Sequence, residues 1–136
     1  NSYAAHVLDL RMENGKPVVE KVCCAIDCGV VVNPDAATNM AEGAITDGVG
    51  NALFGELTFE DGVPQKNNFH QYQMIRMKEA PNEIDVHFVQ NEIDPTGMGE
   101  PPFPPVFGAM ANALYKATGT RYYKQPFITD KPPLVG

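Results

Sequence analysis

The stretch "AAHVLDLRMENGKPVVEKVCCAIDCG", residues 4–29, decides the fold of this chain. Its first half alternates apolar and polar side chains. One face of that alternation carries His6, Leu8, Leu10 and Met12. Asn14 and Gly15 then form the dipeptide that favours a tight turn between antiparallel strands. The return segment is almost continuously apolar after Lys21, so we expect its later half to be buried on both faces. The stretch predicts a β-hairpin.

A helix is expected directly after this hairpin. Asn33 suits its N-cap and Pro34 its first position. One face of the helix would carry small residues, which permits either tight packing on a neighbouring element or the close approach of a flat ligand. The residues on that face are Ala37, Met40, Ala41, Ala44, Gly48 and Ala52.

The rest of the chain predicts further elements of both kinds. Asp61 and Gly62 indicate a second hairpin, and the alternation in residues 83–90 is typical of a strand with one buried face. Residues 104–119 form an amphipathic pattern that ends at a helix-stopping glycine. The proline-rich tail, residues 121–136, can be no more than an edge strand or an extended arm. This order predicts an α+β fold in which two main helices pack on a mixed sheet with β-hairpins.

Length and composition bound the function. With 43% hydrophobic and 20% charged residues, residues 1–136 are expected to be a single domain or part of a larger one. A net charge of −7 argues against a nucleic-acid partner, which would need clustered Lys and Arg. No apolar run approaches the roughly 20 residues of a membrane-spanning helix. The chain begins with Asn1 rather than Met, and we expect it to be a piece cut from a longer polypeptide or processed out of one.

Three cysteines, Cys23, Cys24 and Cys28, cluster at the end of the predicted hairpin. Cys24 and Cys28 would lie about 13 Å apart on an extended strand, which is too far for a disulfide. A zinc site would need further ligands at regular spacing, and the three histidines of the chain are scattered. We therefore expect buried thiols that pack as small apolar side chains, and no metal ligands.

The stretch "TGMGEPPFPP", residues 96–105, is the strongest candidate for a functional loop. Its glycines let the backbone approach another group closely, and its prolines restrict the backbone around Glu100. Taken alone, a glutamate in such a loop is most often solvated. The loop nevertheless joins a strand end to a helix start, where open sheets often place ligands. A glutamate with no partner acid or base in the sequence favours a reaction that uses an external metal, electrophile or cofactor.

Two long stretches resemble one enzyme superfamily. "GMGEPPFPPVFGAMANALYKATGTR", residues 97–121, is similar to the Gly-x-Gly-Glu-Pro signature of the molybdenum hydroxylases, the xanthine oxidase and aldehyde oxidoreductase superfamily. Residues 22–77 resemble the preceding stretch of the same molybdopterin-binding subunits. Within the superfamily, the chain most resembles the large (beta) subunit of isoquinoline 1-oxidoreductase and the membrane-bound aldehyde dehydrogenases. The resemblance covers nearly all 136 residues in the same order.

The resemblance implies a reaction and a role for the loop. Molybdenum hydroxylases oxidise an aldehyde carbon or a carbon beside a ring nitrogen, with oxygen derived from water. By its place in the signature, Glu100 would be the catalytic base that takes the proton from a molybdenum-bound hydroxyl. The cofactor-binding residues implied are Gly97, Met98 and Gly99 in the loop and Met40 and Gly43 on the predicted helix.

One position departs from the family pattern. Family members usually carry Gln two residues before a Glu-Gly pair, where this chain has Met40. Met cannot donate a hydrogen bond. Either one contact to the cofactor is therefore missing, or the neighbouring Asn39 makes it.

The resemblance also implies what accompanies this chain. The parent subunit would hold molybdenum–molybdopterin cytosine dinucleotide between two lobes, and residues 1–136 would be the C-terminal portion of one lobe. The implied partners are the remainder of the molybdopterin-binding subunit, a small 2Fe–2S subunit and, as a further candidate, a cytochrome c subunit. The isolated chain is expected to be inactive, to lack the cofactor and to self-associate through exposed apolar surface. Members of this branch are often bacterial and exported, so a periplasmic or membrane-associated location is a further expectation.

Two other interpretations remain open on the sequence. One is a non-catalytic interaction module built on the same lobe, with Glu100 retained by descent. The other is an unrelated small-ligand binding module whose glycine- and proline-rich loop clamps a partner. Stoichiometric molybdenum and pterin in the full-length protein would favour the enzyme over both.

Overall fold

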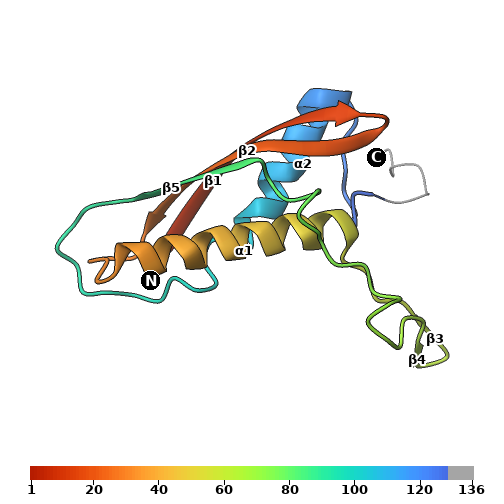
Figure 1. The fold of residues 1–136 in the computed structure, drawn as a ribbon, viewed down its shortest axis with the longest axis horizontal. Coiled ribbons are helices and arrows are strands. Elements are labelled where there is room, and N and C mark those ends of the chain that lie inside the picture. Colours follow the sequence, from red (N-terminus) through yellow and green to blue (C-terminus); the bar gives the residue numbers. More distant parts are fainter. Residues whose placement is uncertain (129–136) are drawn as a thin grey trace.

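The computed structural model describes residues 1–128. Three strands form a mixed sheet in the order β1-β2-β5, with the bounds β1 (Tyr3–Glu13), β2 (Lys16–Asp27) and β5 (Glu83–Phe88). β1 pairs with β2 antiparallel, and β2 pairs with β5 parallel. Two helices, α1 (Pro34–Phe54) and α2 (Pro105–Thr118), pack on one face of this sheet (Figure 1). The predicted α+β fold, with two main helices on a mixed sheet, is confirmed.

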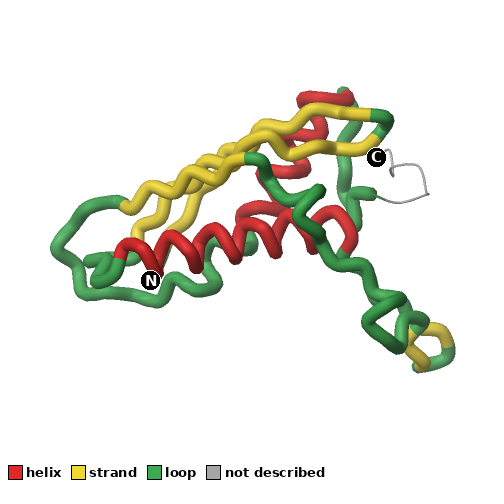
Figure 2. The backbone as a smooth tube through the Cα atoms, viewed as in Figure 1, coloured by secondary structure: helices red, strands yellow, loops and turns green. Residues whose placement is uncertain are grey.

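A second, two-stranded sheet lies outside this body. β3 (Phe59–Glu60) and β4 (Val63–Pro64) form the hairpin predicted at Asp61 and Gly62, both of which have positive φ. The ribbon projects away from the sheet and the helices (Figures 1 and 2). Residues 56–74, which form this projection, are called the arm below.

The turn and helix ends predicted from the sequence are present. Asn14 and Gly15 have φ of 50° and 76°, the left-handed backbone that an Asn-Gly hairpin turn requires. At the start of α1, the Asn33 Oδ1 accepts a hydrogen bond from the Ala36 N–H at 3.1 Å. α2 ends at Gly119, which has φ of 73°. No helix within residues 1–128 has the length and apolar character needed to cross a membrane.

β2 contains a β-bulge that the sequence analysis did not predict. Asp9 pairs with Lys21, but the next residue, Leu10, pairs with Val19, so Glu20 has no partner on β1. The extra residue keeps both Glu20 and Lys21 out of the core while Val19 is buried. Two adjacent charges inside an alternating strand are the pattern that could have indicated the bulge.

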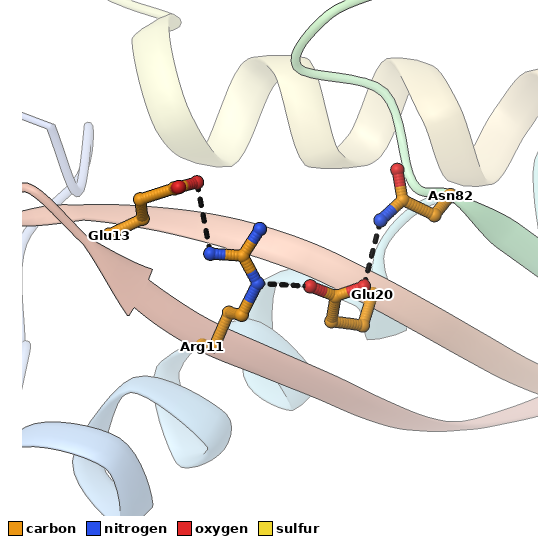
Figure 3. A network of polar contacts seen from close by, with 4 residues as sticks. All are labelled: Arg11, Glu13, Glu20 and Asn82. Carbon is orange, nitrogen blue, oxygen red and sulfur yellow. Dashed lines mark hydrogen bonds and ion pairs between the residues drawn. The ribbon is translucent and has the colours of Figure 1, made fainter.

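A polar network surrounds the bulge (Figure 3). Glu20 accepts hydrogen bonds from Arg11 and, at 2.8 Å, from the Asn82 side chain, and Arg11 also pairs with Glu13 at 2.9 Å. The Asn82 N–H donates to the Val19 carbonyl at 3.2 Å. The hydrogen bonds from Asn82 and Arg11 lower the pKa of the Glu20 carboxyl. Because Asn82 directly precedes β5, these contacts fix where the parallel pairing of β2 and β5 begins.

The later half of β2 is buried on one face only, and the expectation of burial on both faces was wrong. Val22, Cys24 and Ile26 lie in the core, whereas Ala25 is exposed and Cys23 is half-buried. The reason is that α1 and α2 cover the same face of the sheet. Within residues 1–128, the apolar run of β2 therefore includes residues that face outward.

Of the small-residue face predicted on α1, Ala37, Ala41, Gly48 and Ala52 are buried and Ala44 is half-buried, whereas Met40 is exposed. A Cβ on Gly48 would lie 3.1 Å from the main chain just before α2, and one on Gly50 would lie 2.7 Å from the Ile75 Cβ. These two glycines therefore let neighbouring segments pack closely on α1. Met40 and Gly43 are not part of that packing, because Met40 is 51% exposed and a Cβ on Gly43 would meet nothing within 4 Å.

Gly29 lets the chain cross the end of β2. It has φ of 72°, and a Cβ there would lie 2.7 Å from the Ile93 carbonyl oxygen. Two main-chain hydrogen bonds fix the crossing, since Val30 donates to Ile93 and Thr96 donates to Cys28, both at 2.9 Å. The crossing places the start of the glycine- and proline-rich loop at the end of the sheet.

The described part of the tail is an extended segment that forms no strand. The N–H groups of Phe127 and Ile128 donate to the carbonyls of Ala52 and Leu53 near the end of α1, at 2.8 and 3.1 Å. Of the two alternatives for the tail, the extended one holds up to residue 128. The remainder of the predicted tail, residues 129–136, lies outside the described residues.

Gly50 and Gly43 provide a matched pair for testing the packing of α1. Gly50→Ala should lower the free energy of unfolding by about 1–3 kcal/mol, because the new methyl group would overlap Ile75. Gly43→Ala should raise it by roughly 0.5–1 kcal/mol, because alanine is the better helix former and the space beside it is open. Chemical denaturation of the purified chain measures both. Equal effects at the two positions would contradict this packing.

Candidate active site

The Glu100 loop, residues 96–104, leads from the crossing over β2 into α2 (Figure 1). It begins at the hydrogen bond from Thr96 to Cys28, and it closes in a turn in which the Phe103 N–H donates to the Glu100 carbonyl at 2.9 Å. Glu100 is exposed, and within residues 1–128 its carboxylate makes no ion pair and no hydrogen bond. The carboxylate of Glu100 is therefore accessible to a group that does not belong to residues 1–128, such as a ligand or another polypeptide segment.

The main chain before Glu100 is accessible as well. Within residues 1–128, the N–H groups of Gly97, Met98, Gly99 and Glu100 donate to no acceptor. The Met98 side chain packs against the core, while a Cβ on Gly97 would meet nothing within 4 Å. Successive main-chain N–H groups of this kind can bind the oxygen atoms of a ligand. The donors of this loop suit a ligand that is rich in oxygen atoms.

Helix α1 contributes one predicted cofactor residue to the loop. The Met40 Cε lies 3.1 Å from the position of a Cβ on Gly99, so Met40 packs directly on the loop. Gly43 lies about one turn further along α1 and is exposed, without a neighbour within 4 Å of its Cβ position. Asn39, the alternative hydrogen-bond donor, is also exposed. The structure brings Met40 and Gly99 together and leaves Gly43 and Gly97 open.

Ser2 contacts the loop, although the sequence analysis did not select it. Its Oγ lies 2.6 Å from the Thr96 Oγ1 and donates a hydrogen bond to the Gly97 carbonyl. Ser2 is the only serine in the chain, and it belongs to no motif. A contact between residues 94 positions apart leaves no local pattern. Only the folded structure identifies this residue.

A buried thiol, that of Cys24, and the half-buried imidazole of His6 meet without forming a reactive pair. The Cys24 Sγ lies 3.7 Å from the His6 Nε2. Burial raises the pKa of the Cys24 thiol to about 11. Burial also lowers the pKa of His6, which the nearby Pro102 backbone partly opposes. Both groups are therefore neutral at pH 7, and a neutral thiol is a poor nucleophile.

The cysteines otherwise follow expectation in part. Cys24 and Cys28 are buried free thiols, as predicted, whereas Cys23 is half-buried. Burial raises the pKa of Cys28, with a further contribution from the neighbouring Asp27 carboxylate. Within the described range, residues 1–128, no three or more His, Cys, Asp or Glu side chains are grouped so that they could hold a metal ion.

Alkylation rates should differ among the three cysteines. At pH 8, iodoacetamide should modify Cys23 first, because Cys24 and Cys28 are buried and the raised pKa of each keeps its thiol protonated. Peptide mass spectrometry after timed labelling of the folded chain measures the order. The denatured chain is the control, in which all three should react at similar rates. Fastest labelling at Cys24 would contradict the packing described for β2.

Comparison with known proteins points to one family. A family model described as the molybdopterin cofactor-binding domain matches residues 1–81. A membrane-bound aldehyde dehydrogenase (pyrroloquinoline-quinone) of Gluconacetobacter polyoxogenes is 33% identical over 112 residues, which are 82% of this chain and 14% of that protein. The isoquinoline 1-oxidoreductase subunit beta of Brevundimonas diminuta is 31% identical over 128 residues, 93% of this chain and 16% of that protein. This chain therefore covers only a small part of these relatives.

A solved structure shares the fold. The aldehyde oxidoreductase of Desulfovibrio gigas superposes with a TM-score of 0.70 at 28% identity, over 82% of this chain and 13% of that one. The match to the isoquinoline subunit covers 93% of the chain, so it extends past residue 81 and through the Glu100 loop. The resemblance stated from the sequence is thereby confirmed.

Proposed function

Because the chain belongs to the molybdopterin cofactor-binding domain family, we propose that it is the C-terminal portion of the molybdopterin-binding subunit of a molybdenum hydroxylase. The relatives named above are about six times as long as this chain, because matches of 112 and 128 residues make up only 14% and 16% of them. The parent enzyme would oxidise an aldehyde or an N-heterocycle, the substrate classes in the names of those relatives. The isolated chain would be inactive, because most of the subunit is absent from it.

Glu100 is the catalytic base in this proposal. When bound, the cofactor supplies an oxygen nucleophile that comes from water and accepts the electrons of the substrate. A carboxylate oxygen of Glu100 would take up the proton that this reaction releases. The observation that carries the assignment is the exposed carboxylate of Glu100, which within residues 1–128 has no partner and lies beside four successive N–H groups that donate to no acceptor there.

The main chain before Glu100 would bind the cofactor. Among residues 1–128 the N–H groups of Gly97, Met98 and Gly99 have no acceptor, and phosphate or pterin oxygens are suitable acceptors for them. Met40 and Gly43 would border the same cofactor from α1, where Met40 already contacts the loop. Among the possible forms, we propose molybdopterin cytosine dinucleotide. The residues present therefore fit an oxygen-rich cofactor that brings its own metal.

Several exposed apolar side chains indicate that part of the surface of this chain contacts a partner. Val32 is 81% exposed before α1, and in the arm and just after it Phe69 and Met77 are 94% and 90% exposed. Apolar surface of this kind usually contacts another chain or segment. We propose that the remainder of the subunit covers it, and that the isolated chain self-associates. A small 2Fe–2S subunit, and as a further candidate a cytochrome c subunit, would carry the electrons away, in a bacterial periplasm or at its membrane.

Cofactor content tests the proposal at the level of the whole subunit. The full-length protein should contain about one molybdenum and one pterin per subunit, whereas the 136-residue chain should fold and retain neither. The measurements are elemental analysis and pterin oxidation products after purification from a producing strain. One relative is named for pyrroloquinoline quinone, so quinone extraction provides the competing result. A full-length protein with stoichiometric quinone and no molybdenum would refute the assignment.

A single substitution tests the role of Glu100. Glu100→Gln keeps the size and the loop geometry but cannot accept a proton, so turnover per molybdenum should fall by roughly 10²–10⁴-fold. That loss corresponds to about 3–5 kcal/mol in the barrier. Glu92→Gln is the matched control, because Glu92 is an exposed glutamate earlier in the same connection, and it should retain full turnover. A loss below tenfold at full molybdenum occupancy would remove Glu100 from the mechanism.

A further inference from the structure

We propose that Ser2 is a positioning residue that fixes the main chain just before Glu100. The proposal rests on the role proposed for Glu100, because Ser2 would act through that residue rather than on substrate. Ser2 directly precedes β1, and its hydroxyl reaches both Thr96 and Gly97 at the start of the Glu100 loop. The strand that forms one edge of the sheet is thereby joined to the candidate active site.

The hydrogen bonds form a directed chain. A hydroxyl group has one proton to donate and two lone pairs that accept. Ser2 donates its proton to the Gly97 carbonyl, so the 2.6 Å contact with Thr96 must be a bond that Thr96 donates. Thr96 in turn holds the Cys28 carbonyl through its own N–H at 2.9 Å. Each of the two hydroxyl protons is donated once. The Ser2 hydroxyl, the Thr96 hydroxyl and the Gly97 carbonyl therefore fix one another's orientation.

Met98 packs against the core and Met40 packs on Gly99, but few other hydrogen bonds restrain this part of the loop. Its main-chain hydrogen bonds lie at its two ends, at Thr96 and between Phe103 and Glu100. Within residues 1–128, the bond from Ser2 is the only hydrogen bond that reaches residues 97–99 from a distant part of the chain. Glycine has the widest backbone freedom of any residue, so Gly97 depends on this bond more than another residue would.

The position of a general base determines its efficiency. A base must lie within hydrogen-bonding reach of the proton that it takes up, and a displacement of about 1 Å can cost roughly 10²-fold in rate. Loss of the Ser2 hydroxyl would free Gly97 and let Glu100 move relative to the reacting atoms. The turnover number should then fall, while KM stays nearly constant, because the hydrogen bonds of the Ser2 hydroxyl go to Thr96 and Gly97.

The first experiment measures the loop without the reaction. Residues 96–105 contain only six N–H groups, since four of these ten residues are proline. Two of the six, those of Thr96 and Phe103, are hydrogen-bonded within residues 1–128. In the cofactor-free full-length subunit, Ser2→Ala should speed hydrogen exchange at these two amides by about 2- to 10-fold, the range expected for one hydrogen bond. Ser2→Thr, which keeps the hydroxyl, should restore slow exchange. Unchanged exchange in Ser2→Ala would overturn the proposal.

A control variant separates this effect from general destabilisation. Thr118→Val also removes a hydroxyl with two hydrogen bonds, one to the Leu114 carbonyl and one from the Thr120 N–H, at the opposite end of α2. It should leave exchange at Thr96 and Phe103 unchanged. Equal acceleration in Thr118→Val and Ser2→Ala would show a purely structural role for Ser2 and would overturn the proposal.

The second experiment uses the holoenzyme at full molybdenum occupancy. Ser2→Ala should lower kcat by at least about tenfold with KM within about twofold of wild type, and Ser2→Thr should restore kcat. In a Glu100→Gln background, Ser2→Ala should cause no further loss, because the positioned group is already gone. Additive losses, or an unchanged kcat in Ser2→Ala, would overturn the proposal. If Ser2→Ala does not load cofactor, Thr96→Val can replace it, because it removes the hydrogen bond that the Thr96 hydroxyl donates to Ser2. Thr96→Val should also lower kcat at nearly constant KM, but by a smaller factor.

The two proposals fail in different ways. A near-wild-type rate in Glu100→Gln would refute the role of Glu100, whatever the exchange data for Ser2 show. A large loss in Glu100→Gln together with a normal rate in Ser2→Ala would retain the base and refute its positioning by Ser2.

Discussion

At Gly29, the end of β2 and the returning main chain pass too close for any side chain. The positive φ of this residue turns β2 away just as the segment around Ile93 crosses it, and hydrogen bonds from Val30 and Thr96 join the two chains. This crossing decides where the Glu100 loop begins. The loop then enters α2, whose start packs beside Gly48 of α1. The position of the candidate site therefore depends on two close approaches of backbone, each at a glycine.

Local patterns predicted most of the fold. The turn at Asn14 and Gly15 and the cap at Asn33 each depend on residues within one turn of one another, so the sequence shows them directly. The β-bulge at Glu20 and the one-sided burial of β2 depend on which elements lie opposite, and they were not predicted. Periodicity gives the face of an element but not the number of layers that cover the sheet.

The candidate site was predicted by resemblance more than by local chemistry. Glu100 is an exposed glutamate without a partner side chain within residues 1–128, a state shared by many surface residues. What distinguishes Glu100 is the surrounding backbone, whose N–H groups find no acceptor in the described part of the chain, together with the contact between Met40 and Gly99. That contact joins positions 59 residues apart, and the Ser2 contact joins positions 94 apart. Contacts between residues so far apart in the sequence leave no recognisable spacing pattern, so only the folded structure reveals them.

The composition of the Glu100 loop also distributes the conformational entropy of folding unevenly. Each proline after Glu100 restricts its own φ and the preceding residue even in the unfolded chain, so ordering residues 101–105 loses little entropy. Gly97 and Gly99 sample the widest range of unfolded conformations and lose the most. Most of the free energy needed to order the loop is therefore required just before Glu100, at the residues that Ser2 and Met40 contact.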